Sequence, residues 1–176
     1  MAQVSEVLAK HQERTLVLIK PDAVIRGIGM EVLSRFERAG LRIAALKLHL
    51  ATRQMAEQHY TYEDIAARHG ERVRELLLEY ITEGPVIAAV LQGVSAISVV
   101  RKLSGDTEPK KSPAGTIRGD YAHVSYGFCD DAGLAVRNII HASSSLEDAE
   151  REINLWFSPA EVYGTSSSGS NSKSGD

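Results

Sequence analysis

The sequence has few of the residues that mark several classes of protein. It holds a single cysteine, Cys129, among 176 residues, so no disulfide can form within the chain. No basic stretch followed by an apolar one marks its first residues as a signal peptide. The longest apolar run, PVIAAVL at 85–91, is far shorter than the roughly 20 residues needed to cross a bilayer. We therefore expect a cytoplasmic protein without a membrane span.

Common signatures of nucleotide binding are absent as well. The sequence has neither the GxxxxGK[ST] pattern of a P-loop nor the GxGxxG pattern of a dinucleotide-binding turn. Its net charge of -3 and its aromatic content of 6% give little support to binding of nucleic acid. Any phosphate chemistry in this chain would need another device, such as a local basic pocket.

What is present fits one globular domain. The length and the 43% content of hydrophobic residues allow a sizeable core. The last segment, GTSSSGSNSKSGD, has no residue that could anchor in a core. We therefore predict one domain over 1–163 and a disordered tail over 164–176.

Hydrophobic patterning predicts strands alternating with helices. The predicted strands are 15–20, 42–51, 85–93 and 138–143. The predicted helices are 29–40, 52–60, 71–81, 94–105 and 144–157. Alternation along the second strand places Ala44, Leu46, Leu48 and Leu50 toward the core. Ser144 and Glu147 have the spacing of a capping box at the start of the last helix, and segment 121–137 shows no clear pattern.

One histidine stands out in the stretch NIIHASSS at 138–145. His141 ends an apolar run and precedes a cluster of hydroxyl residues. A packed structural histidine is the commoner case, and a nucleophile at the edge of a pocket is the alternative. The local sequence allows both.

Three motifs favour the nucleophile over the packed structural histidine. They are LIKPDAV at 18–24, GTIRGD at 115–120, and NIIHAS at 138–143 followed by a helix that ends in WF. Together, over residues 14–162, they closely resemble the nucleoside diphosphate kinase family. The resemblance implies an α+β, ferredoxin-like βαββαβ domain with a four-stranded antiparallel sheet and extra helices. It also implies transfer of the γ-phosphoryl group of a nucleoside triphosphate to a histidine, and then to a nucleoside diphosphate, in balancing nucleotide pools.

The resemblance also implies roles for individual residues. His141 would be the nucleophile through Nδ1, Glu152 would orient its imidazole, and Ser143 would support this pair. The residues expected around the phosphates and the ribose are Lys20, Tyr60, Arg101, Thr107, Arg118 and Asn138. Phosphoryl transfer depends on positioning and charge stabilisation, which suits this set of cations. Each cation taken alone would more often be an ordinary surface charge.

Mg²⁺ is expected as the counterion of the nucleotide, and no direct metal ligand is assigned. The family also implies a homo-oligomer, a tetramer or hexamer. Three segments depart from the family pattern, and Ser144 stands where the family usually has an acidic residue. Before the third strand, the phenylalanine that stacks on the base is missing, Val73 stands at that position, and about five extra residues are present near 61–72. About ten residues are inserted within 122–136, and the serine-rich tail is the third departure.

Two other readings remain. A catalytically silent nucleotide-binding or scaffold protein could use the same fold. A hydrolase using Ser143 with His141 is weaker, because no acid stands nearby in the usual triad role.

Overall fold

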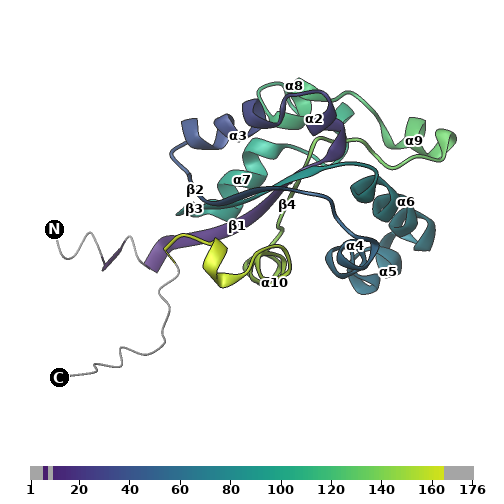
Figure 1. Ribbon diagram of the computed structural model, residues 1–176. Helices are drawn as coiled ribbons and strands as arrows, with labels where there is room; N and C mark the ends of the chain where they lie inside the picture. The colour runs from purple at the N-terminus through teal and green to yellow at the C-terminus, as the bar shows by residue number, and fades with distance from the viewer. Residues whose placement is uncertain (1–5, 8–9, 165–176) are drawn as a thin grey trace, which may run out of the picture.

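The computed structural model describes residues 6–7 and 10–164. Four strands form one antiparallel sheet in the spatial order β2-β3-β1-β4. They are β1 (Gln12–Ile19), β2 (Arg42–His49), β3 (Val86–Val94) and β4 (Ile140–Ala142). Helix α3 lies between β1 and β2 in the chain, and α7 lies between β3 and β4 (Figure 1). This βαββαβ order confirms the predicted α+β, ferredoxin-like class.

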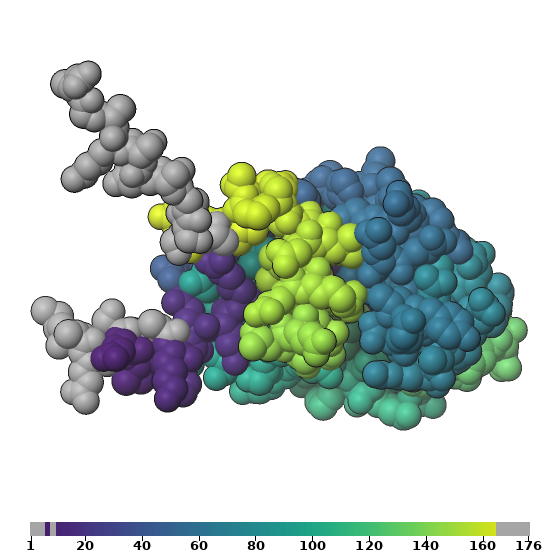
Figure 2. All heavy atoms as spheres, turned by 90° about the horizontal axis from the view of Figure 1, so that it is seen from below, coloured from purple at the N-terminus to yellow at the C-terminus, as the bar shows by residue number. Residues whose placement is uncertain are grey.

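Helices cover both faces of the sheet (Figure 1). One face carries α2 (Pro21–Ile25), α3 (Gly29–Arg38), α7 (Ala96–Ser104) and α8 (Ile117–Tyr121). The other carries α4 (Arg53–His59), the π-helix η1 (Tyr62–Ala66), α5 (Ala67–His69), α6 (Glu71–Thr82) and α10 (Leu146–Trp156). The remaining elements are the 3-10 helix η2 (Pro109–Lys111), α9 (Tyr126–Ala132) and the 3-10 helix η3 (Pro159–Glu161). Seen from below, α10 lies beside α4 (Figure 2).

Strand β1 lies inside the sheet between β3 and β4, and helices cover the sheet on both sides. Its side chains are therefore buried on both faces. Leu16 and Leu18 pack toward α6 and α10, whereas Val17 and Ile19 pack toward α2, α3 and α7. This two-sided burial explains the continuous apolar run that predicted the strand. Lys20 directly follows β1 and therefore lies at the end of the sheet.

The predicted orientation of β2 is wrong beyond Ala44. Ala44 is buried, but Leu46, Leu48 and Leu50 are 44%, 66% and 67% exposed. The register against β3 shifts between Ile43 and Ala45. Such a bulge inserts one residue and reverses which side chains face the core. Because β2 is an edge strand, the three leucines remain uncovered by any part of the chain that the structure describes.

The predicted helices are found, with one change at a cap. Thr52 caps α4, its hydroxyl accepting the Met55 N–H. Helix α10 is capped by Ser145, which accepts the Asp148 N–H, and not by Ser144. The capping-box prediction was therefore wrong by one residue, because three adjacent serines give the same local signal.

The segment 121–137, left unassigned by its pattern, contains α9. The predicted disordered tail lies outside the described residues from 165 onward. None of the helices within the described ranges has the length and apolarity to cross a membrane.

Candidate active site

One cavity of about 710 Å³ gathers most of the residues singled out from the sequence. Its wall is built from the ends of β1 and α4, from η1, from helices α5 to α9 and from β4. The predicted site residues in this wall are Lys20, Tyr60, Val73, Arg101, Thr107, Arg118, Asn138 and His141. Ser143 and Glu152 are buried and reach the site through contacts behind His141. Folding therefore brings together residues from both ends of the domain.

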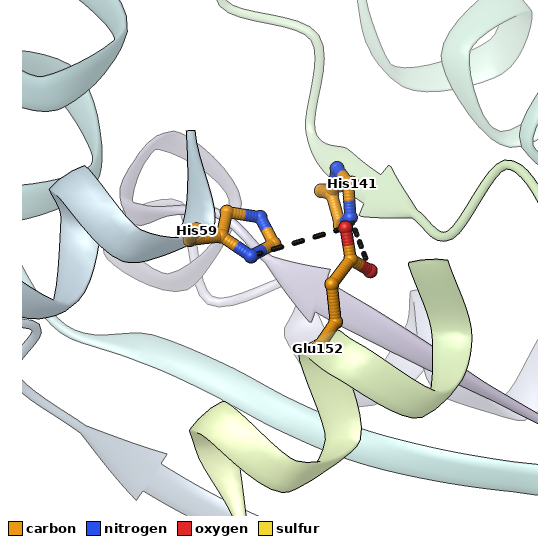
Figure 3. Close-up of side chains that lie close together, drawn as sticks. All are labelled: His59, His141 and Glu152. Atoms are coloured by element: carbon orange, nitrogen blue, oxygen red, sulfur yellow. Dashed lines mark hydrogen bonds and ion pairs between the residues drawn. The ribbon is translucent and has the colours of Figure 1, made fainter. Parts of the chain in front are cut away.

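His141 is held by a carboxylate from α10. Its Nε2 lies 3.0 Å from Oε2 of Glu152, and the two side chains converge from β4 and α10 (Figure 3). The Ser143 hydroxyl donates to the same Oε2 over 2.6 Å. With Glu152 ionised, Nε2 must carry the proton, so the lone pair of neutral His141 is at Nδ1. The pair thus presents a nucleophilic nitrogen in the wall of the cavity.

The charge of Glu152 is maintained despite its burial. Burial by itself raises the pKa of this carboxyl, but the charge and hydrogen bond of His141, followed by His59 and Ser143, outweigh it and lower the pKa to about 2. Glu152 is therefore ionised throughout the physiological range. It can stabilise positive charge on the imidazole of His141.

The opposite part of the wall is cationic. Lys20 is buried, and its Nζ donates to Oδ1 of Asn138 over 2.8 Å. Burial and, after it, the charge of Arg118 lower the pKa of Lys20 to about 7. Arg101 is exposed at the rim of this wall. These groups form a positively charged region with limited access to water, where an anion would be strongly stabilised.

Arg118 is fixed in place by backbone carbonyls. It donates from Nε to Asn138 over 3.3 Å, from Nη1 to Gly105 over 2.8 Å and from Nη2 to Ile140 over 2.7 Å. Burial, and then the charge of Arg101, lower its pKa to about 10. Its five N–H donors exceed these three contacts, so donors remain for a ligand. Thr107 joins the network through its carbonyl oxygen, which accepts from Nδ2 of Asn138 over 2.9 Å.

A strained turn precedes the histidine strand. Ile139 has φ of +72°, which is rare for a β-branched residue. Its N–H donates to Oδ2 of Asp22, and its carbonyl accepts from the Lys20 N–H. These contacts hold the chain in a conformation that is otherwise unfavourable. The turn directs Asn138 toward Lys20 and lets His141 enter β4.

The outer part of the cavity is more apolar. Val73, 38% exposed, lies there with Leu76 and Leu77 of α6. The insertion contributes Tyr126 and Asp130 from α9. No pattern in segment 121–137 indicated these contributions. They depend on how α9 lies relative to α6, which local periodicity does not encode.

Tyr60 and His59 adjoin His141. The Tyr60 hydroxyl is buried and has no hydrogen-bond partner among the described residues. Burial raises the pKa of Tyr60, so the hydroxyl stays protonated. His59 is a neighbour that the sequence did not indicate, and its ring centroid lies 4.4 Å from that of His141.

The side chains of His59, His141 and Glu152 form a cluster of possible metal ligands. His59, His141 and Glu152 could each offer one ligand atom, all within 4.8 Å of one another. Two imidazoles and one carboxylate suit a transition metal, whereas Mg²⁺ prefers oxygen ligands. Nδ1 of His59 already accepts a hydrogen bond from the Trp156 indole over 3.3 Å. The cluster therefore does not fit a resident magnesium ion.

The geometry also argues against the hydrolase reading. The Ser143 side chain is fully buried, and its hydroxyl donates to Glu152. It also accepts the Leu16 N–H over 3.2 Å. A nucleophilic serine needs an exposed oxygen hydrogen-bonded to the general base. Ser143 instead supports the carboxylate that holds His141.

Comparison with known proteins gives a consistent picture. A family model described as nucleoside diphosphate kinase matches residues 13–162. The chain is 45% identical over 150 residues to a nucleoside diphosphate kinase of Borreliella burgdorferi, covering 85% of this chain and 90% of that protein. It is 52% identical over 148 residues to one of Rhodococcus erythropolis, with coverage of 82% and 94%.

Solved structures agree in fold and sequence. A transition-state mimic of nucleoside-diphosphate kinase from Borrelia burgdorferi, with bound vanadate and ADP, has a TM-score of 0.85 and 44% identity, covering 87% of this chain and 91% of that one. An NDP kinase from Pyrobaculum aerophilum has a TM-score of 0.80 and 38% identity, with coverage of 86% and 99%. The chain belongs to the nucleoside diphosphate kinase family and is a phosphotransferase that acts on nucleotides.

Proposed function

We propose that this chain transfers the γ-phosphoryl group of a nucleoside triphosphate to a nucleoside diphosphate through phosphorylated His141. The observation that carries the proposal is the bond between Nε2 of His141 and Glu152, in a cavity that also contains Lys20, Arg101 and Arg118. A neutral, oriented imidazole beside three cationic side chains is what phosphoryl transfer requires.

In the first half-reaction, the lone pair on Nδ1 attacks the γ-phosphorus. The N–P bond forms as the bond from the γ-phosphorus to the β–γ bridging oxygen breaks, and that oxygen leaves with the electron pair on the nucleoside diphosphate. His141 keeps its proton on Nε2, and the resulting positive charge is stabilised by Glu152 over 3.0 Å. In the second half-reaction, a terminal phosphate oxygen of another diphosphate attacks the same phosphorus, and Nδ1 recovers its lone pair. One site therefore serves both nucleotides in turn.

The other side chains act on the nucleotide. Lys20, Arg101 and Arg118 would stabilise the phosphoryl group as its charge redistributes. The unpartnered hydroxyl of Tyr60 would donate to the phosphoryl group on His141. Thr107 and Asn138 would hold the phosphates and ribose, and Val73 would contact the base.

Mg²⁺ would enter bound to the nucleotide phosphates, as part of the substrate. It would neutralise phosphate charge, while the residues of this chain orient the reacting groups. A cytoplasmic site of action and the domain limits 1–163 remain predictions.

The chain would also assemble as a homo-oligomer, a tetramer or hexamer. The exposed leucines Leu46 and Leu48 of β2, with Leu50 just after it, support self-association. They lie along an edge strand, whose free backbone groups and apolar side chains could pair with those of a second copy.

The test is to incubate the protein with ATP and magnesium without an acceptor, then to measure intact mass and map the modified peptide. We expect one acid-labile phosphoryl group on His141, which a nucleoside diphosphate removes. His141→Ala should lose this adduct, whereas His123→Ala, at an exposed position outside the cavity wall, should keep it. Nucleotide binding without any adduct in the parent protein would favour the catalytically silent alternative.

A further inference from the structure

His59, at the end of α4, lies beside the proposed phosphorylation site without any assigned role. Its side chain is fully buried, and its ring stands at 79° to that of His141 with the centroids 4.4 Å apart. Its Nδ1 is 4.0 Å from Oε1 of Glu152 (Figure 3). This distance is too long for a hydrogen bond but short enough for strong attraction if His59 became charged.

A hydrogen bond from Trp156 determines the form of His59. The indole Nε1–H donates to Nδ1 of His59 over 3.3 Å in the core. An indole nitrogen is a donor only, so Nδ1 must keep its lone pair and the ring proton must be on Nε2. Protonation of Nδ1 would place two N–H groups against each other. The bond therefore maintains neutral His59.

The charges around His59 come from several elements. Glu152 and Arg151 of α10, His141 of β4 and Lys20 after β1 all act on it. Burial is the largest influence, and the charge of His141 is the next; together they hold the pKa of His59 well below its usual range, although Glu152 opposes them. Among the charges, only that of Glu152 favours protonation. The hydrogen bond from Trp156 acts against this attraction.

A charged His59 would compete with His141. Oε2 of Glu152 is engaged by His141 and Ser143, but no described residue places a comparably close donor at Oε1, the Arg151 guanidinium being 3.8 Å away. An imidazolium at position 59 would attract Oε1 and draw the carboxylate from His141. It would also repel the positive charge that develops on His141 during phosphorylation.

We propose that His59 is a positioning residue, which the Trp156 indole N–H keeps neutral so that the charge of Glu152 stays directed at His141. This inference rests on the proposed function, because it concerns the orientation of the phosphorylated histidine. It differs from a general packing role, since it predicts a specific change in the pH dependence of phosphorylation when the indole donor is removed.

The test measures single-turnover phosphorylation by magnesium ATP between about pH 5.5 and about pH 8. Trp156→Phe removes the donor and lets His59 take up a proton. Burial and the charge of His141 still lower the pKa of His59 in this variant, so the protonated fraction, and with it the loss of rate relative to the parent, should be largest at the acid end of the range.

Adding a second substitution to Trp156→Phe identifies the histidine that causes the additional acid loss. The side-chain oxygen of Asn lies near the place of Nδ1 and cannot be protonated in this range. Trp156→Phe with His59→Asn should therefore recover the pH profile of the parent. Trp156→Phe with His49→Asn should keep the additional acid loss, because His49 contacts Trp156 at a centroid distance of 6.0 Å, whereas the described hydrogen bonds and ion pairs of Glu152 involve His141, Ser143, His59 and Arg151. A parental pH profile in Trp156→Phe would overturn the proposal, as would an acid loss that survives His59→Asn.

A measurement on the parent protein covers the case in which Trp156→Phe does not fold. With ¹⁵N-labelled histidine, the signal that disappears in His59→Asn should show the neutral Nε2–H form from about pH 5.5 to about pH 8. A signal that titrates, or a proton on Nδ1, would overturn the proposal. This experiment needs no turnover, so its result is separate from a failure of His141→Ala to abolish phosphorylation.

Discussion

At the scale of single residues, the charge of Glu152 is the first feature to test. We expect Glu152→Gln to slow phosphorylation of His141 about ten- to a hundredfold, because a hydrogen bond to a charged group contributes about 1.5–3 kcal/mol. The dissociation constant for ADP should change little, since Glu152 lies outside the cavity wall. Single-turnover kinetics measure the rate. Glu147→Gln on the same helix is the control. An unchanged rate in Glu152→Gln would show that the charge of Glu152 does not contribute to phosphorylation of His141.

The lowered pKa of Lys20 predicts how stability depends on pH and how many protons are taken up when ADP binds. Its pKa of about 7 in the folded protein lies below the usual lysine value of 10.5, so between these values the unfolded chain holds a proton that the folded chain has released. Through Lys20, stability should therefore rise with pH across that window. Bound phosphate would restore the charge of Lys20. At about pH 8, binding of ADP should take up close to one proton.

Titration calorimetry in buffers of different ionisation enthalpy measures this uptake. Lys20→Met should abolish it, whereas Lys102→Met, at an exposed position outside the cavity wall, should keep it. Equal uptake in the parent and Lys20→Met would mean that another group titrates.

Val73 tests the base end of the cavity. An aromatic ring stacked on a base contributes about 1–3 kcal/mol, so Val73→Phe should lower the Michaelis constant about tenfold or more for all bases. The maximal rate should change little, because the phosphate end is untouched. Steady-state kinetics with several diphosphates make the measurement. A raised Michaelis constant would show that another side chain already covers the base.

At the scale of elements, α10 carries Glu152 to the site, and its start depends on one cap. Loss of a serine N-cap costs about 1 kcal/mol, so Ser145→Ala should lower the free energy of unfolding by about that amount. Ser144→Ala should cost less, because Ser145 is the residue that accepts the Asp148 N–H. Denaturant unfolding of both variants measures the two losses in the free energy of unfolding and so identifies the capping serine. A larger loss in Ser144→Ala would restore the cap predicted from the sequence.

The elements also differ in how far local patterning predicts them. The predicted helix at 29–40 is found as α3, with Val32, Leu33 and Phe36 on its buried face, because a helix presents its faces with a period set by its own geometry. The alternation of β2 failed at its bulge. A bulge depends on pairing with β3, which lies more than thirty residues away in the chain.

At the scale of the whole molecule, the uncovered leucines of β2 predict self-association. Leu48→Glu would place a charge in an apolar interface, so it should shift the protein to smaller species. Sedimentation velocity at several concentrations measures this shift. Leu146→Glu changes an equally apolar and exposed residue on α10 and should leave the assembly intact. The same mass for parent and Leu48→Glu would exclude β2 as the contact.

The sequence by itself determined the order of strands and helices, the membership of the family and the residues expected in the cavity. These follow from periodicity and from motifs that are contiguous in the chain, such as KPD and NIIHAS. The segments then meet because the antiparallel sheet places the end of β1 beside β4, with Leu18 opposite His141.

Only the tertiary structure decided the surroundings of those residues. The bond between Trp156 and His59 joins positions 97 residues apart. The carbonyls that hold Arg118 and the carboxylate that holds the turn at Ile139 likewise come from other segments. Hydrogen bonding and burial depend on which groups meet after folding, and a local pattern describes only neighbours along the chain. The tautomer of His59 and the lowered pKa of Lys20 are therefore properties of the assembled fold.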